Sequence, residues 1–153
     1  MRGVGVVMLN YYDDIKEIRD VGPKRREEFN YWQGLLEQSN PGAESRIRDA
    51  LNEIVDAKLS EHGWTNQCWF CSSFLPGSDW RCTPYQPIYN AMCERYGEEP
   101  AWNQSRLFFG LLLKDVMIRR PEHWLCYKVP EQDEIEKGTN YFPDLSTVAS
   151  PNT

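Results

Sequence analysis

Histidine is scarce in this chain: its 153 residues include only two histidines, His62 and His123. A catalytic zinc site with three histidine ligands is therefore excluded. Each histidine follows a glutamate, and neither belongs to the H-E-x-x-H motif of zinc proteases. The sequence also lacks a phosphate-binding glycine loop, the G-x-S-x-G turn of hydrolases and the H-x-E motif of zinc deaminases. These absences argue against several large classes of enzyme.

Long apolar runs are missing as well. No stretch approaches the roughly 20 apolar residues that are needed to cross a bilayer. The run from Gly3 to Leu9 is too short, and no small-residue cleavage site follows it, so a secretion signal is not expected. We therefore expect a protein that does not contact a membrane and that is located in the reducing cytoplasm.

Basic residues are outnumbered by acidic ones, with 17 Lys and Arg against 23 Asp and Glu and a net charge of -6. Proteins that bind duplex DNA neutralise several phosphates with Lys and Arg, so this balance argues against that function. The charge is uneven, because residues 63–121 are nearly neutral and hold 11 of the 20 aromatic residues. This profile indicates a core or contact region between solvated flanks.

The spacing of apolar residues predicts a mainly α fold, with α+β as the alternative. We expect about five helices, one of them short, at residues 13–20, 24–38, 43–62, 83–96 and 103–119. Short strands are expected at 4–9 and 123–129, which would pair as one small two-stranded sheet. A single globular domain over residues 1–130 would then be followed by an acidic, extended or flexible tail over 131–153.

Two of these helices have distinctive patterns. In the helix at 43–62, apolar residues recur at three- and four-residue spacing, and Gly63 follows as the expected C-terminal cap. In the helix at 103–119, the run from Leu107 to Ile118 is apolar nearly all round. A helix of that kind is buried among other helices or covers a partner.

The cysteines form the candidate metal site of the sequence. Cys68 and Cys71 are a C-x2-C pair, whose short turn can direct two sulfurs at one metal ion. Cys82 precedes a predicted helix, whose dipole favours a thiolate. The fourth ligand of a structural zinc ion would be one of four residues: Cys93, His62, His123 or Cys126. The alternatives are small buried hydrophobic residues, a redox-active C-x2-C pair and disulfides.

The segment 64–82 holds three of the five cysteines and several residues of the types that dominate protein interfaces. The candidate partner-binding residues are Trp64, Trp69, Phe70, Trp80 and Arg81. The alternative is that the aromatic residues simply form the core.

Three functions are compatible with these features. The first is a non-catalytic protein-interaction module, such as a subunit of a larger assembly or a small inhibitor that occludes a partner surface. The second is a zinc-stabilised protein that binds single-stranded nucleic acid with aromatic platforms beside basic groups. The third is a small cysteine-dependent enzyme, which would pair Cys126 with His123 or Cys68 with His62.

Overall fold

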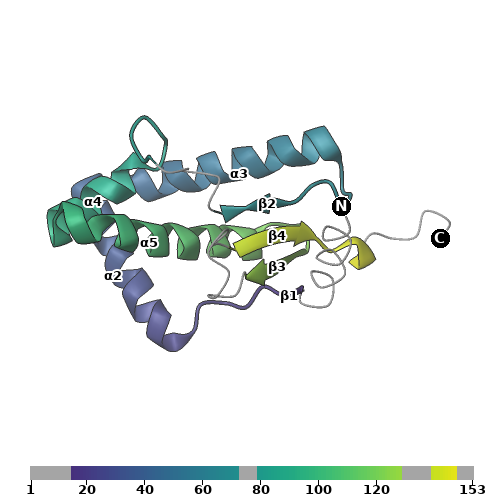
Figure 1. Cartoon of the computed structure of the whole chain (residues 1–153), viewed down its shortest axis with the longest axis horizontal. Coiled ribbons are helices and arrows are strands. Elements are labelled where there is room, and N and C mark those ends of the chain that lie inside the picture. The colour runs from purple at the N-terminus through teal and green to yellow at the C-terminus, as the bar shows by residue number, and fades with distance from the viewer. Residues whose placement is uncertain (1–14, 73–78, 129–138, 148–153) are drawn as a thin grey trace, which may run out of the picture.

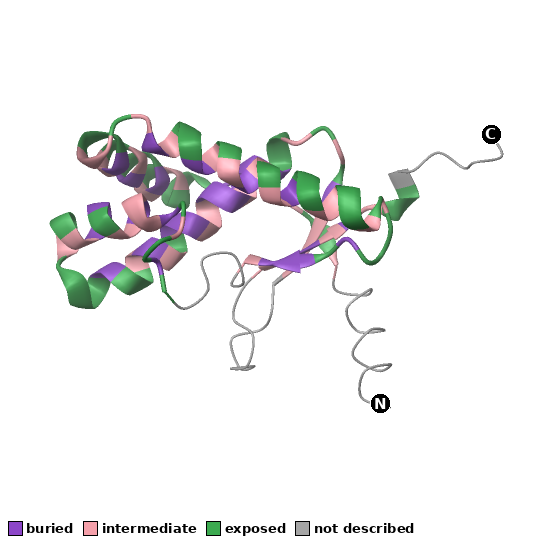
Figure 2. Cartoon of the chain, turned by 90° about the horizontal axis from the view of Figure 1, so that it is seen from above, coloured by how far each residue is buried: buried purple, intermediate pink, exposed green. Residues whose placement is uncertain are grey.

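The computed structural model describes residues 15–72, 79–128 and 139–147. These residues form helices and a small sheet. The helices are α2 (Pro23–Ser39), α3 (Ala43–His62), α4 (Gln86–Tyr96) and α5 (Glu98–Arg119). The strands are β1 (Lys16–Glu17), β2 (Phe70–Cys71), β3 (Trp124–Lys128) and β4 (Thr139–Pro143), and a 3-10 turn, η2 (Leu145–Thr147), follows them. The sheet packs against one side of the helices toward one end of the molecule (Figure 1, Figure 2). The described part of the chain is thus mainly helical, as predicted, with four helices rather than five.

The long helices lie close to their predicted positions. α2 and α3 agree with the sequence pattern to within a residue, and α3 ends at Gly63, whose φ is 67°. α5 begins at Glu98, five residues earlier than predicted, because Gly97 alone separates it from α4. Pro100 therefore falls in the first turn of α5, where a helix tolerates proline since the missing N–H needs no partner there.

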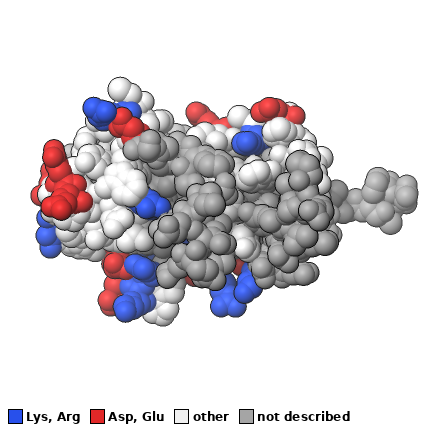
Figure 3. All heavy atoms as spheres, in the orientation of Figure 1, with Lys and Arg blue, Asp and Glu red and all other residues white. Residues whose placement is uncertain are grey.

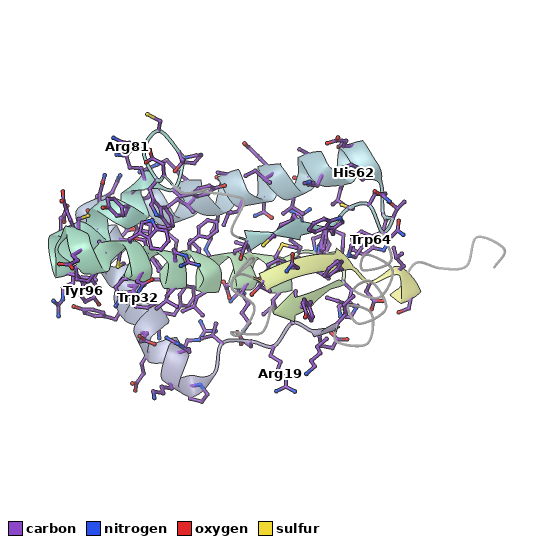
Figure 4. All side chains as sticks on the ribbon, in the orientation of Figure 1. Arg19, Trp32, His62, Trp64, Arg81 and Tyr96 are labelled. Carbon is purple, nitrogen blue, oxygen red and sulfur yellow. The ribbon has the colours of Figure 1, made fainter. Side chains whose placement is uncertain are left out.

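The core is formed where the buried stripes of the helices meet. Phe108 of α5 lies 5.9 Å, between ring centroids, from both Phe29 and Trp32 of α2. Trp32 is buried, and its indole Nε1 donates a hydrogen bond of 3.0 Å to the Tyr96 hydroxyl at the end of α4 (Figure 4). The ring contacts contribute packing and the hydrogen bond satisfies a polar group that would otherwise be costly to bury.

A chain of polar side chains ties α2, α3 and α5 together. Gln33 donates a hydrogen bond of 3.0 Å to Glu44, and Arg48 donates one of 2.9 Å to the same carboxylate. Arg48 also pairs at 2.8 Å with Asp115, whose side chain is only 5% exposed. Arg119, one turn further along α5, pairs with the same Asp115 oxygen at 3.0 Å. The buried carboxylate therefore has two cationic partners, as a buried charge requires.

The sheet is antiparallel, with the strand order β1-β3-β4-β2. One face contributes Phe70, Tyr141 and Trp124 to the hydrophobic core, and Cys126 packs against it. The alternation of side chains along a strand sends the cross-strand neighbours Cys71, Asn140 and Tyr127 to the opposite face. The sheet thus has one face on the helices and one face turned away from them.

Several predictions about the strands were wrong. The residues Lys16 and Glu17, expected in a helix over 13–20, form the edge strand β1. In the part of the chain that the structure describes, the sheet has four strands rather than two. The strand at 123–129 is confirmed as β3, whereas the one expected at 4–9 lies outside the described residues. Residues 139–143, expected in a tail over 131–153, form β4, which lies between β3 and β2.

Candidate interaction surface

The structure does not gather the predicted zinc ligands. Cys68 and Cys71 are buried and Cys82 is exposed, while Cys93, Cys126 and His62 are half-buried. Among residues 15–72, 79–128 and 139–147, no three His, Cys, Asp or Glu side chains are placed to hold a metal ion. His62 lies at one end of the molecule, and Arg81, the neighbour of Cys82, lies toward the other (Figure 4). His62 and Cys82 therefore do not share a site.

His123 does not contact Cys126 through either ring nitrogen, as the predicted catalytic pair would require. Nδ1 of His123 lies 2.7 Å from a carboxylate oxygen of Asp144, and Nε2 lies 2.6 Å from one of Glu17. Hydrogen bonding to Glu17 and Asp144 raises the pKa of His123, against the effect of partial burial. Both ring nitrogens are thus occupied by carboxylates, and the histidine joins β1 and β3 to the turn after β4.

Burial works against reactive thiols at two of the cysteines. It raises the pKa of Cys126, and it likewise raises the pKa of Cys68. A cysteine nucleophile needs the opposite shift, because the thiolate is the reacting species. The environments of these two side chains therefore suit buried, unreactive thiols.

The predicted partner-binding residues separate into two groups. Phe70 and Trp80 are each only 3% exposed, and Trp80 packs edge-on against Phe109 at 5.9 Å. Trp64 makes a similar contact at 5.1 Å with the buried Trp124, so Phe70 and Trp80 belong to the core and the half-buried Trp64 packs against it. The alternative reading, that the aromatic residues form the core, holds for them.

Trp69 and Arg81 are the two exposed members of that set. Trp69 is 41% exposed and stacks on Phe142 with ring centroids 6.2 Å apart. Arg81 forms an exposed ion pair with Asp79 at 2.8 Å. Figure 4 places Arg81 near the opposite end of the molecule from Trp64. The predicted residues therefore do not form one continuous surface.

A different surface emerges on α5. Six large hydrophobic side chains are exposed in the described residues, and three of them belong to this helix: Trp102 at 42%, Leu107 at 44% and Ile118 at 38%. The others are distributed over α2, the segment before β2 and η2: Tyr31, Trp69 and Leu145. α5 thus concentrates apolar surface that the rest of the described fold leaves uncovered.

Helical geometry aligns part of this surface. Leu107, Leu111, Lys114 and Ile118 follow one another at four-, three- and four-residue spacing, which places them on one face of a helix. We call these four residues the α5 stripe. Leu107 and Ile118 are exposed, while Leu111 and Lys114 are half-buried. The remaining circumference of the helix is largely packed, with Phe108, Leu112 and Val116 each at most 3% exposed.

Two cationic side chains lie on or beside the α5 stripe. Arg106, whose guanidinium lies 4.7 Å from the Trp102 ring, and Lys114 have no ion-pair partner among the described residues. Asp115 is buried and already paired with Arg48 and Arg119. The carboxylates of α5 that are exposed lie in its first turn, and Figure 3 shows acidic side chains gathered at the end of the molecule where α4 turns into α5. Within a chain of net charge -6, this helix face carries unpaired positive charge.

The sequence predicts the helix but not its exposed face. The run from Leu107 to Ile118 is apolar, yet the residue types typical of interfaces lie in segment 64–82. The signal that was available is the spacing of the stripe together with the lysine inside it. Because the helix is apolar nearly all round, this spacing does not by itself show which face is exposed. The exposed face can be recognised only when the neighbours of the helix are known.

Comparison with known proteins gives no relative for this chain. A scan against protein families, a search of curated proteins and a search of solved structures each found no match. None of the helices in the described part of the chain has the length and apolar character to cross a membrane.

Proposed function

We propose that this protein is a non-catalytic protein-interaction module, acting as a subunit of a larger assembly or as an inhibitor that occludes a partner surface. The observation that supports this proposal is the α5 stripe, on which Leu107 is 44% and Ile118 is 38% exposed on one helix face. Burying the exposed part of each side chain would contribute about 1 kcal/mol, since full burial of Leu or Ile is worth about 1.5–3 kcal/mol. We also infer a cytoplasmic location, which the sequence predicts.

A photo-crosslinking residue on the stripe tests the proposal. Introduced at Leu107 and, separately, at Ile118, it should link the protein to the same partner in cells. The control carries the same residue at Glu53, an exposed position on α3, and should give no such product. If no protein crosslinks at either stripe position, the assignment of this surface to protein binding is wrong.

A second candidate function rests on the Trp69–Phe142 stack, whose ring planes meet at 19° on the sheet face turned away from the helices. Exposed aromatic rings are the platforms on which single-stranded nucleic acids stack. A salt-dependent affinity for single-stranded RNA that Trp69→Ala reduces about tenfold would favour this function, because stacking is worth about 1–3 kcal/mol per base. The associated zinc ion remains a prediction, which the metal content of protein purified without chelator tests.

A further inference from the structure

We propose that the partner bound by the α5 stripe is an acidic amphipathic helix, in which Asp and Glu flank a row of apolar side chains. This inference rests on the proposed function and specifies the chemistry of the partner. Three features of α5 carry it: the linear shape of the stripe, one cation within the stripe and one beside it that have no ion-pair partner among the described residues, and the open space at Gly110.

The shape of the stripe fits a helix. Leu107 and Ile118 are 11 residues apart on one face, a separation of about 16 Å along the helix axis. A helix laid alongside presents anchors at three- and four-residue spacing over the same length. Leu111 adds a half-buried apolar contact between the two exposed ends of the stripe.

The approach of a second helix is open at Gly110, which lies one turn from Leu107 and Lys114. No heavy atom lies within 4 Å of the position that a Cβ would take at Gly110, apart from its own helix backbone and chain neighbours. A glycine at a helix surface permits close contact between backbones, since no side chain separates them. The partner can therefore come near enough for its apolar row to cover the leucines.

The cations of α5 favour a partner with negative charge. Lys114 lies within the stripe and Arg106 lies to one side of it, both without a carboxylate partner among the described residues. The nearest acidic side chain of the helix, Asp115, is buried and paired. Carboxylates on an incoming helix would pair with these cations, whereas Lys or Arg would meet like charge. A second copy of this chain is disfavoured for the same reason, because two stripes in contact would bring the cations of both copies together.

Two synthetic peptides of about 20 residues, long enough to populate a helix, provide the test. Both carry the same row of leucines, one with glutamates at the flanking positions and one with lysines there. Fluorescence anisotropy with the full chain should show that the glutamate peptide binds at least about tenfold more tightly, an effect of charge complementarity that falls as salt is added.

Matched variants locate the binding on α5. The double variant Arg106→Glu and Lys114→Glu should reverse the preference between the two peptides, and Leu107→Asp with Ile118→Asp should abolish binding of both. The charge control is Arg19→Glu with Lys24→Glu, at two exposed cations that do not belong to α5. The apolar control is Leu145→Asp, whose side chain is 44% exposed, as that of Leu107 is. Both controls should bind like the unaltered chain, and circular dichroism should show that every variant keeps its helices.

Several results would overturn the inference. Equal binding of the two peptides, a preference for the lysine peptide, or no binding of either at millimolar concentration excludes an acidic helix as the partner. A dimer in sedimentation velocity that Leu107→Asp dissociates would assign the stripe to a second copy instead. The crosslinking experiment is independent of these outcomes, since a partner that links at Leu107 while both peptides fail supports protein binding and rejects the acidic helix.

Discussion

The buried carboxylate of Asp115 provides the sharpest test of how α3 and α5 are held together. Replacing it in Asp115→Asn keeps the shape of the side chain and removes its charge. Arg48 then loses a charged partner at 2.8 Å, and Arg119 loses one at 3.0 Å. The side chain of Arg48 is 24% exposed and that of Arg119 is 69% exposed, so the two losses differ in size.

The magnitude follows from this difference in exposure. A hydrogen bond to a charged group in a mostly buried setting contributes about 1.5–3 kcal/mol. An exposed ion pair one helix turn apart contributes about 0.3–0.5 kcal/mol. Asp115→Asn should therefore lower the free energy of unfolding by about 2–3 kcal/mol, and Arg119→Ala by no more than about 0.5 kcal/mol.

Urea denaturation followed by circular dichroism measures both losses, and the acid dependence adds a second readout. Hydrogen bonds from Arg119 and Arg48 lower the pKa of Asp115, although burial alone would raise it. A carboxyl with a lowered folded-state pKa stabilises the fold above its unfolded value, near 3.9, and loses that contribution as pH falls through the folded value. The difference between wild type and Asp115→Asn should thus shrink in acid. A loss under about 0.5 kcal/mol at neutral pH, well below the expected range, would refute the reasoning.

Three further predictions concern other parts of the fold. Because hydrogen bonds to carboxylates raise the pKa of His123, its stabilising contribution is complete below about pH 6.5 and is lost as pH rises through the folded value. His123→Gln should remove that part of the pH dependence of unfolding, and an NMR titration of the ring should show a midpoint above about 6.5. Phe108→Ala should cost about 3–5 kcal/mol in chemical denaturation, since Phe108 is fully buried and contacts two aromatic rings; a loss under about 1 kcal/mol would contradict that packing. Gly97→Ala should cost about 1–3 kcal/mol in thermal melts, because φ 86° with ψ 162° is a region that alanine avoids and the site is otherwise open.

The helices were predictable because their signals are local. In α3 the buried residues Ile47, Leu51 and Val55 repeat at four-residue spacing, and Gly63 stands directly after the last turn. β1 has only two residues, too few to show any alternation, and it exists because Lys16 pairs with Cys126 far along the chain. Such pairing is a property of the folded arrangement and leaves no pattern in the local sequence.

The site was harder to predict, since exposure depends on neighbours. Trp80 stands between two charged residues and Trp69 between a cysteine and a phenylalanine, yet Trp80 packs against Phe109 and Trp69 is 41% exposed. Spacing alone could not show that Cys68 and Cys82 lie in different environments, one buried and one exposed. The apolar run of α5 indicated a buried or partner-covered helix, and the structure buries most of its side chains while Leu107 and Ile118 stay exposed.

The position of β4 has a consequence for the order in which the chain can assemble during synthesis. Among the described residues β4 is the last strand in the sequence, but it pairs with both β3 and β2. A nascent chain that has emerged only as far as β3 can form its helices and the short β1–β3 pair, while β2 still lacks β4, the strand with which it pairs. A product truncated before Thr139 would keep that open edge permanently, and unpaired strand edges are sites of aggregation. Synthesis of β4 is therefore the step that joins β2 to the rest of the sheet.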